Sequence, residues 1–235
     1  MTSDSHRLLL PRRVLLLVAL PGWCALLLIV RWVRSGHPAF RFLAWNLILA
    51  AAPAVASALF VRAVRHGSGR SVRALWFGAW LLFLPNAPYI LTDFIHLHPR
   101  PPVPFWYDIA VWLSFAGAGL VLGYSSVADV QAVVARRAGT RAGWALAVVA
   151  LMLSGLGIYA GRFLRWNSWD ALVHPHRILQ HVRGASLNPG DHPRSLGVTL
   201  VYGLGLVMGY VMLRIAVPQR PLPNDRDAVP PGVAR

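Results

Sequence analysis

The chain has 235 residues, of which 56% are hydrophobic and only 13% are charged. A soluble domain carries roughly 25% charged residues, so this composition excludes an ordinary soluble domain and indicates a surface that faces lipid. Apart from histidine, every basic residue is Arg and every acid is Asp, and the net charge is +15. That charge would suggest nucleic acid in a soluble protein. Here the Arg residues lie mostly between apolar runs, where they meet anionic head groups, so we expect no nucleic-acid partner.

A helix needs about 20 consecutive apolar residues to cross a bilayer. Six runs approach that length, and in chain order they cover residues 14–33, 42–61, 74–91, 106–124, 143–161 and 196–217. Backbone polar groups must be satisfied within the lipid, so each run is expected to be helical. The predicted fold class is all-α, a polytopic transmembrane bundle of six helices over residues 14–217. We expect residues 1–13 to form a cytoplasmic segment and the proline-rich residues 218–235 to form a disordered tail.

The first run follows a basic start, as a secretory signal peptide would. It is long for such a segment, and no small-x-small cleavage site follows it. The bulky Trp23 before the single cysteine, Cys24, also argues against processing as a lipoprotein. We therefore expect a retained helix.

Arg counts in the loops predict the orientation. With a cytoplasmic amino terminus, the inside segments hold 14 Arg residues and the outside segments hold 9. The positive-inside rule then places both termini in the cytoplasm. Five of the nine outside arginines lie in the last outside loop, so either the orientation is reversed or those arginines have another role.

The third run contains Leu84-Pro85-Asn86-Ala87-Pro88-Tyr89, and its two prolines should kink or break the helix. A broken helix at membrane depth is tolerated where it lines a cavity or is packed in protein. Asn86 could therefore belong to a transporter site. The same break could instead aim the loop that follows toward the other loops on its side.

In a six-helix topology the first, third and fifth loops emerge on one face of the membrane. Seven of the nine histidines lie in these loops, although the loops on the two faces are similar in length. This convergence is the main sequence indication of a functional site.

Asp93 and His96 lie where the third loop begins. If the helix continues past the prolines, the two residues share a face at i, i+3, where a carboxylate and an imidazole could bind a metal or move protons. His98 would join them only if the helix ends, and the prolines after it indicate that it does. Asp108 follows one turn into the fourth run, where it could simply complement the positive end of the helix.

The fifth loop opens with Gly161-Arg162-Phe163-Leu164-Arg165-Trp166-Asn167-Ser168-Trp169-Asp170. On a continuing helix, Arg162, Trp166, Trp169 and Asp170 would lie along one side. This stretch could be an interfacial belt with snorkelling arginines. It could equally be an anion site in which Arg binds phosphate or carboxylate and Asp holds the Arg in place.

His174-Pro175-His176 is expected to be a turn with two imidazoles, which could ligate a metal but is more often only a loop. The stronger metalloprotease, thiol, hydrolase and nucleotide-binding signatures are absent from the sequence, so no metal or cofactor is assigned.

Three glycine pairs are spaced by four residues: Gly119 and Gly123, Gly157 and Gly161, and Gly205 and Gly209. Small residues at this spacing let membrane helices approach closely, so we expect these pairs to mark packing surfaces.

Three segments of the chain resemble an uncharacterised bacterial membrane-protein family, domain of unknown function 1361. They are Trp45-Asn46, the Leu84–Tyr89 motif with Thr92-Asp93 and His96, and the Gly161–Asp170 stretch. The resemblance covers roughly residues 40–215. It implies a multi-pass inner-membrane protein, and it implies no activity, substrate or cofactor.

Together these observations predict a polar Asp/His/Arg site at the external membrane boundary. Its predicted catalytic residues are Asp93, His96 and Asp170, and its predicted substrate-binding residues are Arg162, Arg165, Asn167 and Asn86. The leading hypothesis is an enzyme that acts on a lipid-linked or anionic substrate, with anionic lipid head groups as partners. The alternatives are a transporter or channel that uses the broken third helix, and a non-catalytic assembly protein.

Overall fold

A computed structural model describes the backbone of residues 4–166, 173, 176 and 193–216, with side chains from residue 17 onward. All regular elements among these residues are helices. They are α1 (Asp4–Ser35), α2 (Arg41–Arg65), α3 (Arg70–Phe83), α4 (Asn86–Tyr89), the 3₁₀ helix η1 (Ile90–His96), α5 (Phe105–Ala138), α6 (Thr140–Phe163) and α9 (Pro193–Ala216). Six spans are long and apolar enough to cross a membrane, with α3, α4 and η1 forming one of them. The predicted all-α membrane bundle is confirmed.

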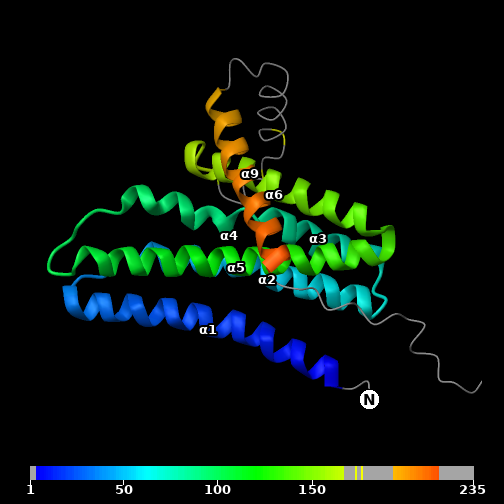
Figure 1. The fold of residues 1–235 in the computed structure, drawn as a ribbon, viewed down its shortest axis with the longest axis horizontal. Coiled ribbons are helices and arrows are strands. Elements are labelled where there is room, and N and C mark those ends of the chain that lie inside the picture. The colour runs from blue at the N-terminus through cyan, green and yellow to red at the C-terminus, as the bar shows by residue number, and fades with distance from the viewer. Residues whose placement is uncertain (1–3, 167–172, 174–175, 177–192, 217–235) are drawn as a thin grey trace, which may run out of the picture.

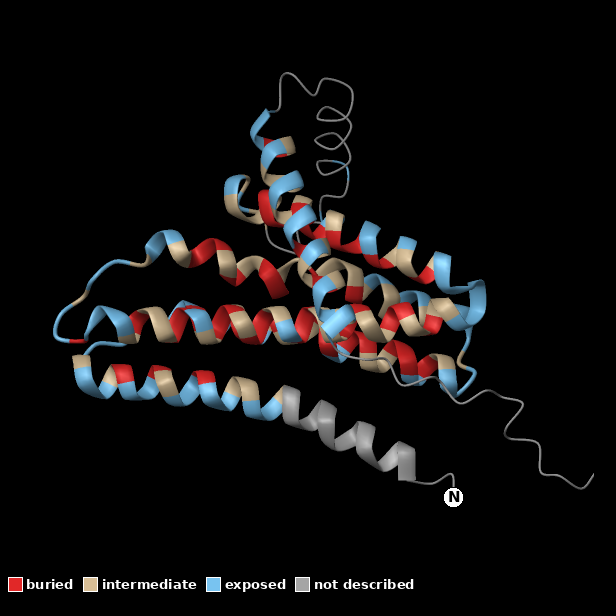
Figure 2. Ribbon diagram, in the orientation of Figure 1, coloured by how far each residue is buried: buried red, intermediate tan, exposed pale blue. Residues whose placement is uncertain are grey.

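The central element of the bundle is α5, which packs against α1, α2, α4 and α6 (Figure 1). Buried residues follow the inner faces of α5 and its neighbours, whereas α1 and α9 present mostly exposed residues to the outside (Figure 2). The exposed positions include many large apolar side chains, such as Val33, Val201 and Ile215. Such residues suit a surface in contact with lipid.

The core divides into two clusters along the bundle. One joins α1, α2 and the first half of α5, with Phe40, Trp112 and Phe115 among its buried side chains. The other joins the far halves of α2 and α5 to α3, α6 and α9, around Trp80 and Tyr210. The helix break at α4 lies between them, since Ala87 belongs to the first cluster and Leu84 to the second.

The predicted interruption of the third span is confirmed, since α3 ends at Phe83 and α4 begins at Asn86. Pro85 and Pro88 lack the amide hydrogen that a helix interior needs. The Asn86 amide nitrogen donates to the Phe83 carbonyl at 3.0 Å, so its side chain replaces part of the lost backbone pairing. The chain then tightens into η1, which carries it to the end of the bundle.

Two glycine pairs hold α4 between α5 and α6. A Cβ atom on Gly119 would collide with the Ala87 carbonyl oxygen, and one on Gly123 would lie 2.8 Å from the Ala87 Cβ. On α6, a Cβ on Gly157 would lie 2.5 Å from Pro85, and one on Gly161 would lie 2.9 Å from the Tyr89 ring. The expected packing role is confirmed for these two pairs.

The third glycine pair behaves differently. Gly209 lies against the Tyr124 hydroxyl, whereas a Cβ on Gly205 would meet nothing within 4 Å. The expectation of close packing is therefore wrong for Gly205. Helices α6 and α9 instead approach each other at Gly155 and Gly203, since a Cβ on Gly155 would lie 2.7 Å from the Gly203 amide nitrogen.

Helix α5 is much longer than its apolar run at residues 106–124. It contains 34 residues. At about 1.5 Å per residue this corresponds to roughly 51 Å, more than the ~30 Å of a hydrocarbon core. The extra turns carry Asp129, Arg136 and Arg137 at the end that joins α6. Helix α5 must therefore tilt or project beyond the hydrocarbon.

The α2–α3 and α5–α6 connections lie at one end of the bundle, and the α1–α2 and η1–α5 connections lie at the other (Figure 1). Reporter fusions at Gly67 and Pro102 should accordingly report opposite sides of the membrane. We expect Gly67 to be cytoplasmic, because the two hairpins at its end are rich in Arg. Two reporters on the same side would contradict this topology, and the opposite assignment would reverse the orientation.

Candidate functional site

The site is built on η1, which carries Asp93 and His96. A 3₁₀ helix has three residues per turn, so side chains at i and i+3 eclipse each other. The predicted common face of Asp93 and His96 is therefore confirmed, although the helix that creates it is 3₁₀ rather than α. The helix ends at His96 because Leu97 is extended. His98 does not join the pair, and its Nε2 accepts a hydrogen bond from Arg100 at 2.9 Å.

Asp93 is buried, with 3% of its surface exposed. Its Oδ2 accepts a hydrogen bond of 2.6 Å from the Asn46 amide of α2. Its Oδ1 lies 3.5 Å from a terminal guanidinium nitrogen of Arg162 on α6. An uncompensated buried carboxylate is costly, so the amide and the cation together stabilise its charge. One carboxylate thereby joins three separate spans of the bundle.

Arg162 connects this buried carboxylate to the surface. Its other terminal nitrogen lies 3.0 Å from Nε2 of His96, which is exposed. A guanidinium group can only donate hydrogen bonds, so Nε2 must accept in this contact. Phe42 approaches the His96 ring edge-on, with ring centroids 6.2 Å apart. We call Asn46, Asp93, His96 and Arg162 the polar cluster.

A glycine lets α6 pack closely against the end of α4, directly before η1. Gly161 immediately precedes Arg162, and its missing side chain leaves room for the Tyr89 ring. The same helix end places a cation in the last turn, where it complements the negative end of the helix. Close packing and helix polarity therefore both favour an Arg at position 162.

Arg165 ends the helical path. Its φ of 57° is left-handed. Such a conformation is uncommon for a residue other than glycine. The amides of Leu164 and Trp166 both donate to the Ala160 carbonyl, at 3.2 and 3.1 Å. Because α6 stops at Phe163, the expectation that Arg162 and Trp166 lie along one side of a continuing helix is wrong. The chain turns at Arg165 instead.

The structure brings together three of the predicted site residues, Asp93, His96 and Arg162. Asn86 is placed locally at the helix break, and Arg165 is an exposed residue of the turn. Asn167 and Asp170 lie outside the described residues, so their membership stays a prediction. Asn46 was not predicted as a site residue. The signal that could have found it is a single amide side chain within the apolar second run.

A second polar contact joins α1 to α5. Arg31 and Asp108 form a bidentate ion pair, with Nε–Oδ1 at 2.7 Å and a terminal nitrogen to Oδ2 at 3.1 Å. Both side chains are buried, at 1% and 0% exposed. The Arg31 guanidinium also lies 4.3 Å from the centroid of Phe40, which is held in a left-handed conformation. Asp108 is therefore the partner of a buried cation. The sequence interpretation, in which Asp108 only complements the positive end of α5, did not include this ion pair.

These two pairs explain part of the Arg distribution. Arg31 and Arg162 both lie at the end that the Arg counts predict to be outside, yet each is paired with an aspartate rather than free to act as a topological signal. At least one arginine of the last outside loop, Arg162, thus has another role, which is one of the two alternatives that the Arg counts left open. Over the described residues, no three His, Cys, Asp or Glu side chains gather as metal ligands would.

The arrangement of spans, lipid-facing surface and buried ion pairs is that of a polytopic helical membrane protein. Residues 45–208 match the family described as protein of unknown function (DUF1361), and the chain belongs to that family. No curated protein and no solved structure shows significant similarity to the chain. The family match spans α2 to α9 and thus all four residues of the polar cluster, but it leaves α1 outside.

Proposed function

We propose that the protein is a membrane enzyme that acts on an anionic, lipid-linked substrate at the external boundary of the bilayer. The observation that carries this proposal is the position of Arg162, which joins the buried Asp93 to the exposed His96. Such a guanidinium is anchored on one side and accessible on the other. Arg is well suited to binding phosphate or carboxylate in this way.

In this proposal each member of the cluster has a role. Arg162 binds the anionic group of the substrate, and Asp93 is a positioning residue that holds the guanidinium. When a substrate oxygen accepts the hydrogen bond that Arg162 now donates to His96, Nε2 of the imidazole loses its hydrogen-bond partner. A free imidazole nitrogen beside the bound anion can then accept or donate a proton. Asn46 orients the carboxylate of Asp93. Asp170, Asn167 and Arg165 are further candidates for contact with the substrate.

The transporter alternative rested on the broken third helix. Among the described residues the break is filled by protein, because four glycines on α5 and α6 bring backbone and side chains against α4. A void of about 10 Å³ lies beside it, lined by Leu84, Pro88 and Leu151 among others. That space is about the size of one water molecule. Packing of this kind favours a structural role for the break, which fixes the direction of η1.

The proposal is tested by binding and turnover in lipid nanodiscs. Arg162→Gln should weaken binding of a polyprenyl phosphate probe by about tenfold or more, because a charge-assisted contact is worth roughly 1.5–3 kcal/mol. Asp93→Asn should weaken binding as well, and Asp93→Glu should restore part of it. His96→Gln should retain binding but abolish the change in lipid-linked anions that wild-type protein produces in a bacterial lipid extract, as followed by mass spectrometry.

Arg34→Gln is the matched control, since Arg34 is exposed at the same end of the bundle. It should bind the probe as wild type does. If Arg34→Gln and Arg162→Gln weaken binding equally, the attraction is diffuse and the proposed site is wrong. If wild-type protein changes no lipid-linked anion, or His96→Gln changes the same ones, the enzymatic role is wrong. Folding of each variant is checked by its thermal unfolding in detergent.

A further inference from the structure

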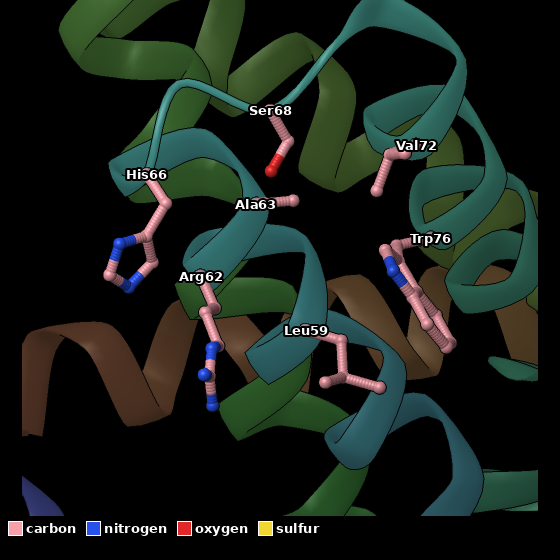
Figure 3. A pocket seen from close by; sticks show the side chains of 7 residues that line it. All are labelled: Leu59, Arg62, Ala63, His66, Ser68, Val72 and Trp76. Atoms are coloured by element: carbon pink, nitrogen blue, oxygen red, sulfur yellow. The ribbon is translucent and has the colours of Figure 1, made fainter.

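The opposite end of the bundle contains a cavity of about 340 Å³ between α2 and α3. It is lined by Leu59, Arg62, Ala63, His66, Ser68, Val72 and Trp76 (Figure 3). Arg62 and His66 project from successive turns of α2, while Val72 and Trp76 come from α3 (Figure 3). The polar cluster lies at the other end of both spans, so this cavity is a separate feature of the molecule.

The turn between the helices shapes one wall of the cavity. Gly67 has a φ of 65°. This left-handed conformation lets the chain reverse at the end of α2. The amide of Ser68 then donates to the Ala63 carbonyl at 2.9 Å, and that of Gly67 donates to Val64 at 3.4 Å. This is the Schellman arrangement, and it folds Ser68 back over Ala63. The Ser68 hydroxyl thereby faces the space between the two helices (Figure 3).

The lining changes in character along the cavity. Arg62, His66 and Ser68 supply a cation, an imidazole and a hydroxyl near the turn. Leu59, Val72 and Trp76 supply an apolar wall on the side of the membrane spans. Trp76 is half-buried, as tryptophans at head-group depth often are. A ligand that matches this change from polar to apolar lining has an anionic head group and an apolar chain.

The two helix connections at this end of the bundle carry positive charge. Residues 62–73 contain four arginines and no acid, and residues 136–141 of the neighbouring hairpin contain three more arginines and no acid. Basic pockets between membrane helices attract anionic lipid head groups. The surrounding bilayer also supplies such lipids continuously. Charge complementarity and the apolar wall therefore point to the same occupant.

We propose that the α2–α3 cavity binds the head group of an anionic phospholipid. Its phosphate lies between Arg62, His66 and Ser68, and the first part of an acyl chain lies along Leu59 and Trp76. The cavity volume is in the range of small-ligand sites and suits a phosphoglycerol head group rather than a whole lipid. This site does not depend on the proposed enzyme activity, because no residue is shared between the two.

Native mass spectrometry of the protein in a neutral detergent tests the proposal. Phosphatidylglycerol should bind with one preferred copy per chain, and phosphatidylcholine should bind at least about tenfold more weakly. The double variant Arg62→Gln/His66→Gln should lower phosphatidylglycerol binding by about tenfold. Val72→Trp should lower phosphatidylglycerol binding to a similar extent. Val72 is exposed, so the larger side chain can fill the cavity without changing any charge.

Arg65→Gln is the matched control, since Arg65 lies on the same helix end, is exposed and does not line the cavity. It should change binding by less than about twofold. An equal loss in Arg65→Gln and the double variant would show diffuse attraction and overturn the proposal. Full binding by Val72→Trp would overturn it too. Displacement of the lipid by millimolar glycerol 3-phosphate would show a site for soluble anions instead.

Discussion

Replacing Asp108 with Asn should lower the free energy of unfolding by about 3–5 kcal/mol, because it leaves the buried Arg31 without its counter-ion. Arg31→Met should cost a similar amount for the complementary reason. Both side chains are essentially inaccessible, and two short contacts join them. The pair also links α1 to the central helix, so its loss should loosen α1. Thermal unfolding in detergent would measure the effect, which should be on the order of 10 °C.

The double variant Arg31→Met/Asp108→Leu distinguishes an unpaired charge from a general packing defect. Apolar residues of similar volume often replace a buried ion pair with little loss, so the double variant should be markedly more stable than either single variant. Arg34→Met, an exposed change one turn along α1, should be nearly neutral. If Asp108→Asn costs less than about 1 kcal/mol, the pair behaves like a surface salt bridge and the structural role assigned to it is wrong.

Gly119→Ala should destabilise the protein by about 1–3 kcal/mol, although alanine normally favours a helix over glycine by about 1 kcal/mol. The added Cβ would collide with the Ala87 carbonyl oxygen, and a backbone atom in a packed segment cannot move aside easily. Helix α4 would have to shift away from α5. Because η1 continues directly from α4, the shift should also weaken the contact between Asp93 and Asn46, and with it probe binding.

Gly117→Ala is the internal control for that experiment. Gly117 lies on the same helix two residues away, and a Cβ there would meet nothing within 4 Å. This variant should be unchanged or slightly stabilised, by up to about 1 kcal/mol. Equal unfolding temperatures for the two variants would contradict the close approach of α4 to α5.

The number and type of the spans could be predicted from the sequence because apolar length is a local property. The break in the third span could be predicted for the same reason, since Pro85 and Pro88 each remove a hydrogen bond from their own helix. The common face of Asp93 and His96 also followed from spacing alone. Each of these predictions depends on residues close together in the chain.

Contacts between distant segments could not be predicted in the same way. Arg31 and Asp108 are 77 positions apart, and Asn46 and Asp93 are 47 apart. Loop parity placed Asp93 and Arg162 on one side of the membrane, but it could not show which loop residues touch. The turn at Arg165 could not be predicted because its left-handed conformation is unusual for Arg. The helix was therefore expected to continue to Asp170.

The separation of Arg31 from Asp108, 77 positions along the chain, has a consequence for how the protein is made. A ribosome adds about 5–20 residues per second, so roughly 4–15 seconds pass between the synthesis of the two partners. Throughout that interval Arg31 has been synthesised and Asp108 has not. Arg31 lies near the end of its span, which closes at Ser35. A long side chain there can extend toward the head groups at low cost. The ion pair can form only when α5 packs against α1. We therefore expect it to stabilise the packing of the inserted helices and not the insertion of α1 itself.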